Sequence, residues 1–254
     1  MQAGKYQKTF KKGVATAGII VLLLVGTIHA RAMNLLVVGN FSRFIPGKSL
    51  PDGWKPLAFR KIERHTGYTW IKVGDIGVIK AVSRESASGL IREMTIDPEK
   101  YPVIKWRWKV TGIYKKGDVT KKSGDDFPAR IYITFAYNPK KVGFFERMKF
   151  SAIKLLYGEY PPGSAITYIW ANKLPKQAVV DNPYTGRIKM IAVESGKENL
   201  NTWIDEKRNI YEDYIKAFGK KPPLISGVAI MTDSDNTGES TVSYYGDIVF
   251  EPAP

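Results

Sequence analysis

The feature that most constrains the fold is a two-residue alternation of apolar and polar side chains that recurs along the chain. Nine runs rich in β-branched and aromatic residues show it: 69–73, 77–83, 89–94, 104–110, 130–137, 165–170, 187–193, 226–231 and 241–250. Successive side chains of a strand point to opposite faces, so the alternation predicts strands with one buried face. Turn-forming residues such as Asp75, Gly163 and Asn182-Pro183 separate the runs.

Two other segments have a helical period. Residues 144–156 place on one face Phe145, Met148, Ala152 and Leu155. Residues 203–218 place on another Ile204, Ile210, Tyr211, Tyr214 and Phe218, with Asn201 or Thr202 as a cap and Gly219 as a stop. Because a sheet must bury its apolar face, the strands and helices together predict an all-β fold. We expect an antiparallel β-sandwich, of the jelly-roll or concanavalin-like kind, with two peripheral helices.

The first 32 residues have the order of an export signal. Four lysines precede an uncharged apolar run at 14–25, and Ala30-Arg31-Ala32 fits a small-x-small cleavage site. We expect cleavage after Ala32. The alternative is an uncleaved anchor, because residues 14–28 approach the ~17 residues that a spanning helix needs. The prediction is therefore a signal peptide or N-terminal anchor at 1–32 and one monomeric β-sandwich domain at 33–254, periplasmic or secreted, which touches a membrane only through that segment.

Charge and cysteine content limit the partners and the chemistry. The chain has no cysteine, which excludes disulfides, thiolate metal sites and cysteine nucleophiles. Of 39 Lys and Arg residues, five lie in the first 32 positions and none of the 24 acids do, so residues 33–254 carry a net charge of +10. This balance favours anionic envelope partners such as acidic polysaccharide. Export argues against nucleic acid.

Alternation also predicts a polar sheet face. Trp106, Trp108 and Val110 share the apolar side of their strand and belong to the core, whereas Arg107 and Lys109 share the other side. Arginine holds a carboxylate through two parallel hydrogen bonds, and aromatic rings offer flat surfaces to sugars. The predicted ligand-binding residues are Arg107, Arg130, Tyr168, Asn172, Arg187 and Tyr245. The alternative is a plain solvated face, as any half-exposed sheet has.

Two groups of residues are candidates for catalysis. Asp125 and Asp126 are adjacent in a glycine-containing loop, and paired carboxylates can act as acid and base on a glycoside or bind a hard cation. His65 is the one histidine outside the predicted signal, and with Tyr132 or another tyrosine it can move protons in a lyase. The alternatives are a turn with an ion pair from Asp125 or Asp126 to Arg130, and a structural histidine.

The stretch MTDSDNTG at 231–238 resembles the first half of a calcium loop. Asp233, Asp235 and Thr237 offer oxygen ligands at alternate positions, but Tyr244 stands where a helix-loop-helix calcium site needs glutamate. No obligatory cofactor is expected. A calcium site of another type, with Asp233, Asp235 and Asp247 as ligands, stays open beside the simpler interpretation of a long hairpin turn.

Several stretches together resemble a bacterial exported family known as domain of unknown function 3047. They are RHTGYT, SASGL, YPVIKWRWKV, KSGDDFPARIY, YIWAN, NPYTGRIKMIAVESG, MTDSDNTG and YYGDI, and the resemblance runs from about Phe41 to Ile248. It implies an exported single-domain protein and brings no established activity or catalytic residues with it. From the residues we predict a protein that binds an acidic glycan. The alternatives are a glycoside hydrolase or polysaccharide lyase on the same scaffold, and a structural protein of the envelope.

Overall fold

A computed structural model describes residues 34–141 and 161–253, together with residues 1, 143, 148, 150 and 151. The chain divides into two compact units, Met1–Ala32 and Met33–Pro254, and the second unit is described below. The predicted export signal and most of the predicted helix at 144–156 lie outside the described residues. Within the described part, no helix has the length and apolar character needed to cross a membrane.

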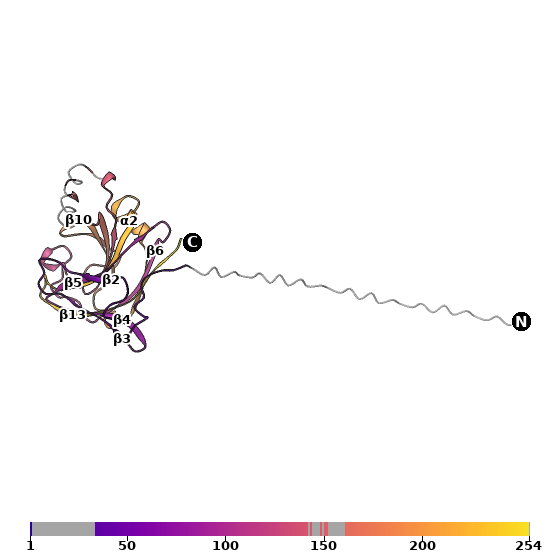
Figure 1. Ribbon diagram of the computed structural model, residues 1–254, viewed down its shortest axis with the longest axis horizontal. Coiled ribbons are helices and arrows are strands. Elements are labelled where there is room, and N and C mark those ends of the chain that lie inside the picture. The colour runs from indigo at the N-terminus through magenta and orange to yellow at the C-terminus, as the bar shows by residue number, and fades with distance from the viewer. Residues whose placement is uncertain (2–33, 142, 144–147, 149, 152–160, 254) are drawn as a thin grey trace. The chain divides into compact units, whose positions relative to one another are not determined.

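The strands form two sheets (Figure 1). The first has the order β11-β6-β13-β4-β3, with β1 also paired to β13. Its strands are β1 Leu36–Gly39, β3 Gly67–Val73, β4 Ile76–Arg84, β6 Val103–Val110, β11 Ile204–Asn209 and β13 Ser240–Glu251. The second has the order β2-β5-β12-β7-β8-β10-β9. Its strands are β2 Trp54–Leu57, β5 Ala87–Ile96, β7 Arg130–Phe135, β8 Ser164–Ala171, β9 Val179–Asn182, β10 Thr185–Ser195 and β12 Ile225–Asp233.

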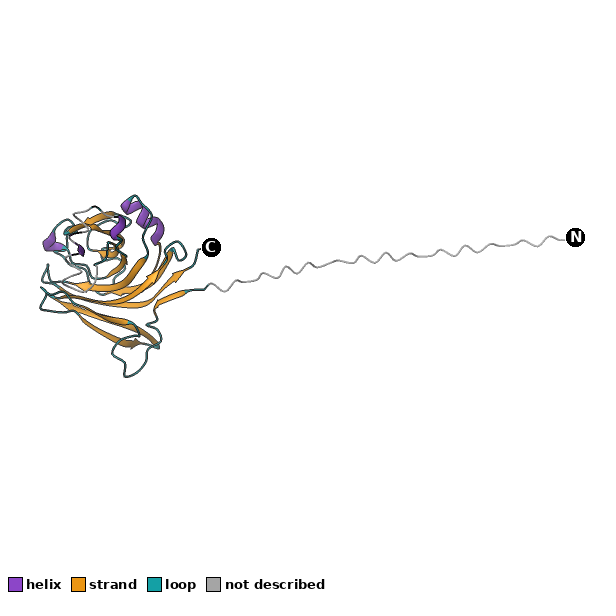
Figure 2. Cartoon of the chain, turned by 45° about the horizontal axis from the view of Figure 1, so that its top comes forward, coloured by secondary structure: helices purple, strands orange, loops and turns teal. Residues whose placement is uncertain are grey.

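The two sheets pack face to face as layers (Figure 2). Aromatic side chains from both fill the space between them. Trp106 of β6 stacks on Tyr168 of β8 with ring centroids 5.1 Å apart, and Trp108 lies 6.0 Å from Trp170. All four side chains are buried. The predicted all-β sandwich is therefore confirmed, and the placement of Trp106 and Trp108 in the core is correct.

The second sheet is mixed rather than purely antiparallel. Strand β10 pairs with β8 in parallel and with β9 in antiparallel orientation. The chain leaves β8 at Ala171, passes to the edge strand β9 and returns as β10 beside β8. Alternation gives the two faces of a strand but not its direction, so the sequence could not reveal this pair.

The predicted helix at 203–218 is half strand. Helix α2 spans Ile210–Phe218, with Asn209 as its N-cap, and it ends at Gly219 in the left-handed region at φ 68°. Residues 204–209 instead form β11, which pairs along β6. The predicted start and caps of this helix are wrong because residues 205–209 are all polar and carry no apolar period of their own, so pairing with β6 decides their conformation. The stop at Gly219 is correct.

Short helical turns complete the described structure. They are η1 Lys122–Gly124 and η2 Pro139–Lys141. Turn η1 lies in the loop that carries Asp125 and Asp126 from β6 to the start of β7. This loop closes over the outer face of the second sheet, where several of the predicted site residues meet.

Candidate functional site

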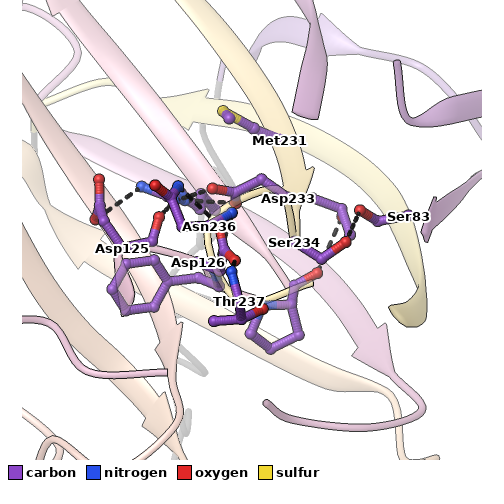
Figure 3. A network of polar contacts seen from close by, with 12 residues as sticks. Ser83, Asp125, Asp126, Met231, Asp233, Ser234, Asn236 and Thr237 are labelled. Carbon is purple, nitrogen blue, oxygen red and sulfur yellow. Dashed lines mark hydrogen bonds and ion pairs between the residues drawn. The ribbon is translucent and has the colours of Figure 1, made fainter. Parts of the chain in front are cut away.

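A group of acidic side chains surrounds Arg130 on the outer face of the second sheet (Figure 3). We call Asp125, Asp126, Asp233 and Asp235, together with Arg130, the acid cluster. Strand β7 begins at Arg130, and β12, which pairs Met231 with Arg130, ends at Asp233. Side chains two residues apart on a strand share a face, so this register puts Asp233 on the same face as Arg130.

The guanidinium of Arg130 is held from three sides. Its Nε donates to Asp233 Oδ1 at 2.8 Å, and a second nitrogen donates to the other carboxylate oxygen of Asp233. Its Nη1 lies 3.5 Å from Asp125 Oδ1 and 3.1 Å from the hydroxyl of Tyr132. Arg130 is only 1% exposed, so it forms a buried ion pair with Asp233 and is not the solvent-facing ligand-binding residue we expected. The alternative interpretation of the sequence, an ion pair from Asp125 or Asp126 to Arg130, is confirmed for Asp125.

Asp126 fixes the loop between β12 and β13. Its Oδ1 accepts from the backbone and side-chain nitrogens of Asn236 at 3.3 and 3.1 Å, and its Oδ2 accepts from the Thr237 backbone at 2.5 Å. Asn172 Nδ2 donates to the Asp126 carbonyl at 2.8 Å. The stretch MTDSDNTG is therefore a loop whose backbone donors are satisfied by a carboxylate from another segment.

The acid cluster holds more negative than positive charge. Asp125, Asp126 and Asp233 are buried beside one buried guanidinium. Burial raises the pKa of Asp233 well above its ordinary value, although Arg130 opposes this, and burial likewise raises the pKa of Asp125. The pKa of the half-buried Asp235 is raised by burial and by the charge of Asp126. Such a desolvated excess of carboxylate favours either protons or a cation.

Three of these carboxylates can hold a metal ion. Asp126, Asp233 and Asp235 each offer an oxygen, and the three oxygens lie within 4.8 Å of one another. Asp247, the third predicted ligand, lies elsewhere. Its Oδ1 and Oδ2 accept from the backbone and hydroxyl of Ser42 at 2.7 and 2.6 Å, so Asp247 belongs to the first sheet and the expected ligand set is wrong at this position.

A pocket of about 270 Å³ opens on the outer face of the first sheet. It is lined by Arg107, Trp203 and Asp247, with apolar residues at the turn between β3 and β4. The Arg107 guanidinium lies 4.8 Å from the centroid of the Trp203 ring. Strand β13 shifts its register between Tyr245 and Ile248, and at this point Arg107 crosses the strand so closely that a Cβ on Gly246 would lie 2.4 Å from Arg107 Cγ. A glycine is needed here for Arg107 to reach the pocket.

Beside this pocket, cations and aromatic rings alternate across the sheet. Tyr244 of β13 pairs with Lys80 of β4 on one side and with Lys109 of β6 on the other. Trp203 immediately precedes β11, whose first residue pairs with Trp108, so Trp203 lies beside Lys109. The Lys109 ammonium is 4.6 Å from the Tyr244 ring centroid and 5.4 Å from that of Trp203. We call Lys80, Tyr244, Lys109 and Trp203 the cation–aromatic row.

The row is open to solvent and its lysines are not neutralised. All four side chains are partly exposed. Among the described residues, neither Lys80 nor Lys109 has a carboxylate within ion-pair distance. Four strand positions at a spacing of about 4.8 Å span about 14 Å. The row is therefore a positively charged, aromatic strip of that length.

The remaining predicted site residues belong neither to the acid cluster nor to the cation–aromatic row. Tyr168 and Tyr245 are fully buried, where their hydroxyls donate to Asp213 Oδ2 at 2.7 Å and to the Met231 carbonyl at 2.6 Å. Arg187 lies on β10 with its guanidinium 4.5 Å from the Phe150 ring centroid. His65 is exposed in the loop between β2 and β3. The expected single polar face does not form, because alternation assigns a face within one strand but does not say which sheet the strand joins.

The sequence contains part of the signal for the row. Lys109 shares its strand face with Arg107 in WRWKV, and this can be read directly. Tyr244 was missed in favour of its neighbour Tyr245, although one of two adjacent strand residues must face outward. Trp203 was hidden by the helix predicted there. Lys80 has no distinguishing pattern around it.

Comparisons with known proteins identify a family and a distant structural likeness. The model of the family described as "Protein of unknown function (DUF3047)" matches residues 52–249. No curated protein matches the chain in sequence. Among solved structures, endoglucanase 3 of Trichoderma harzianum, from family GH12, aligns over 87% of this chain and 98% of its own, with 10% identity and a TM-score of 0.38. That score is too low to transfer any property from one protein to the other.

Proposed function

The chain belongs to the family Protein of unknown function (DUF3047), and because this description names no activity, we propose a function from the geometry of the site alone. The protein is exported and binds an acidic glycan along the cation–aromatic row. The observation that carries the proposal is the alternation of Lys80, Tyr244, Lys109 and Trp203 across adjacent strands. The resemblance to an endoglucanase plays no part in it.

The chemistry of the row suits a chain of sugars that bear carboxylates. An aromatic ring offers a flat apolar surface to the apolar face of a sugar, and an ammonium forms a charge-assisted hydrogen bond with a carboxylate. Aromatic rings and ammonium groups alternate along about 14 Å, which fits a polymer whose repeating sugar has an apolar face and a carboxylate. Arg107, in the adjoining pocket, has its Nε 3.6 Å from the exposed Asp205, and the two terminal nitrogens of its guanidinium can hold a ligand carboxylate. The net charge of +10 on residues 33–254 strengthens long-range attraction to a polyanion.

The acid cluster supports a glycan-binding or catalytic role less well. Its net charge repels an anionic ligand. Asp126 is fully buried, and hydrogen bonds to the next loop already occupy both of its carboxylate oxygens. Burial raises the pKa of Tyr132 to about 12, so its hydroxyl stays protonated at neutral pH. Binding therefore has more support than the glycoside hydrolase or polysaccharide lyase alternative with His65, Asp125, Asp126 and Tyr132 as catalytic groups.

Affinity electrophoresis of the full chain tests the proposal. We expect retardation in gels that contain polygalacturonate and none in gels that contain dextran. The double variant Lys80→Ala/Lys109→Ala and the single variant Trp203→Ala should each bind at least about tenfold more weakly, since each removes charge-assisted or stacking contacts worth more than about 1.4 kcal/mol. Raising the salt concentration should weaken wild-type binding.

A charge-matched control separates the row from general basicity. Lys61→Ala/Lys220→Ala removes two exposed lysines that lie outside the first sheet and should bind polygalacturonate like the wild type. Equal losses in the two double variants would reduce the interaction to net charge. Retardation that Lys80→Ala/Lys109→Ala leaves unchanged would end the proposal, and binding to neither polymer would favour a structural role in the envelope.

A further inference from the structure

Two buried hydroxyl groups beside the acid cluster have no hydrogen-bond partner among the described residues. They are the hydroxyls of Tyr114 and Thr237, in side chains 1% and 4% exposed. Thr237 is held against Asp126 through its backbone N–H. The strongest charges acting on the Tyr114 hydroxyl are those of Asp233 and Asp126. Buried hydroxyls normally bond to a protein group, an ordered water or a ligand, so these two can serve a further group bound beside the carboxylates.

Charge balance shows the sign of that ligand. Three buried carboxylates face one buried guanidinium, and Asp235 adds a half-buried fourth. Buried charges in proteins are paired or coordinate metals. Arg130 already uses Asp233 and reaches Asp125, and among the described residues Asp126 and Asp235 have no cationic side chain within ion-pair distance. A positive group next to Asp126 and Asp235 would balance the cluster.

From these contacts we propose that the acid cluster binds one calcium ion through Asp126, Asp233, Asp235 and the hydroxyl of Thr237. Asp126 comes from the loop before β7, Asp233 from the end of β12 and Asp235 from the loop that follows it. Figure 3 shows Asp126 and Asp233 close together. Carboxylate oxygens can accept hydrogen bonds and still bind a cation, because each oxygen has two lone pairs. Water completes the shell. This proposal concerns a different face of the molecule from the cation–aromatic row and stands independently of the glycan proposal.

The ligand set selects calcium over other metals. No histidine or cysteine is present in the cluster, so the donors are all oxygen, which excludes sites of the usual zinc type. No two of these oxygens are more than 4.8 Å apart, a separation that one calcium ion, with Ca–O distances of about 2.3–2.6 Å, can bridge. Calcium takes six to eight oxygen ligands in flexible geometry, whereas magnesium keeps several waters and is usually bound through only one or two carboxylates.

The test uses the full-length protein and calcium itself. Elemental analysis after dialysis against CaCl₂ should find one calcium ion per chain. After chelation, titration with CaCl₂ should raise the melting temperature by about 5–10 °C at a hundredfold excess over Kd, and MgCl₂ should raise it far less. Asp235→Asn, which changes the least buried ligand, should bind calcium at least about tenfold more weakly, because affinity follows the charge of the ligands. Asp75→Asn, an exposed aspartate in the β3–β4 turn, is the matched control and should bind normally.

A second variant keeps the proposal falsifiable if a ligand change disturbs folding. Thr237→Val preserves the shape of the side chain and removes only the unpartnered hydroxyl. Without calcium it should melt no lower than the wild type, because no hydrogen bond is lost, and with calcium it should gain less. The proposal is overturned if no calcium is found, or if Asp235→Asn binds as tightly as the wild type. It is equally overturned if lowering the pH raises the melting temperature while calcium leaves it unchanged, since protons would then balance the charge of the carboxylates.

Discussion

The acid cluster and the cation–aromatic row are built by the same rule and reach opposite outcomes. Each is built around outward-pointing residues on neighbouring strands, one group on each sheet of the sandwich. Over the second sheet, the loops at 125–128 and 234–237 close on Arg130 and Asp233, so their charges become internal. Over the first sheet nothing among the described residues covers Lys109 and Tyr244. Alternation puts charge on a sheet face, and the loops decide whether that charge is buried or stays open to solvent.

The largest expected effect comes from removing the buried ion pair of the acid cluster. Arg130→Met leaves Asp233 buried without its partner and should lower the free energy of unfolding by about 3–5 kcal/mol. The double variant Arg130→Met/Asp233→Leu should recover much of that loss, because no uncompensated charge remains. Urea unfolding of the two variants and the wild type gives the comparison. A single variant as stable as the wild type would show that Arg130 is not the internal partner that the contacts indicate.

A smaller effect is expected from displacing Arg107 from the pocket beside the cation–aromatic row. Gly246→Ala places a methyl group 2.4 Å from Arg107 Cγ and 2.8 Å from its Cδ, so the whole Arg107 side chain must move out of the pocket. We expect the free energy of unfolding to fall by about 1–3 kcal/mol, with polygalacturonate binding reduced several-fold. Affinity electrophoresis and thermal melts of the variant measure the two effects. Unaltered binding would assign recognition to the row alone, without Arg107.

A third effect is a pH dependence at the edge of the first sheet. Burial and the neighbouring Glu194 raise the pKa of Glu206 to about 7, although Lys176 and Arg208 oppose the shift. A carboxyl whose folded pKa is raised contributes stability in its protonated form, which is lost as pH rises from about 4.5 through about 7. Glu206→Gln should therefore raise the melting temperature at pH 8 and leave it nearly unchanged at pH 4. Exposed Glu198→Gln is the control, and equal shifts for Glu206→Gln at both pH values would contradict the assignment.

Much of the sandwich could be predicted from the sequence because its long central strands alternate strictly. The phase of Trp106 and Trp108 alone predicts them in the core, and both are buried there. The short edge strands β1, β2 and β9, of four residues each, are too brief to show a period. Strand β11 was predicted as helix because Ile204 fits the helical period of the apolar residues from Ile210 onward, while residues 205–209 are all polar. The contact with β6 makes them a strand.

The sequence identified many of the residues of the acid cluster and of the first-sheet pocket, but it did not predict how they are arranged. Asp125, Asp126, Arg130 and Asp233 stand out in two distant stretches of the sequence, and they meet. Their proposed exposure was wrong, because a loop that covers a sheet face leaves no trace in the alternation of the strand beneath. For the open face, Arg107 was identified but Tyr244 and Trp203 were not. Which strands become neighbours is decided by long-range packing, and single-strand patterns do not contain that information.

The register shift in β13 constrains the length of that strand. Tyr245 pairs with Trp108 and Ile248 with Trp106, so three steps along β13 match two along β6. The additional residue reverses the phase, which lets Tyr244 face solvent while Ile248 and Phe250 face the interior. Deleting Gly246 would match two steps of β13 to two of β6 and leave Ile248 and Phe250 facing the interior, with the extra residue opposite Arg107 lost. A single-residue deletion at Ser243, which has no such extra residue beside it, would instead move Val242 and Thr241 to opposite faces, and it should be far more harmful.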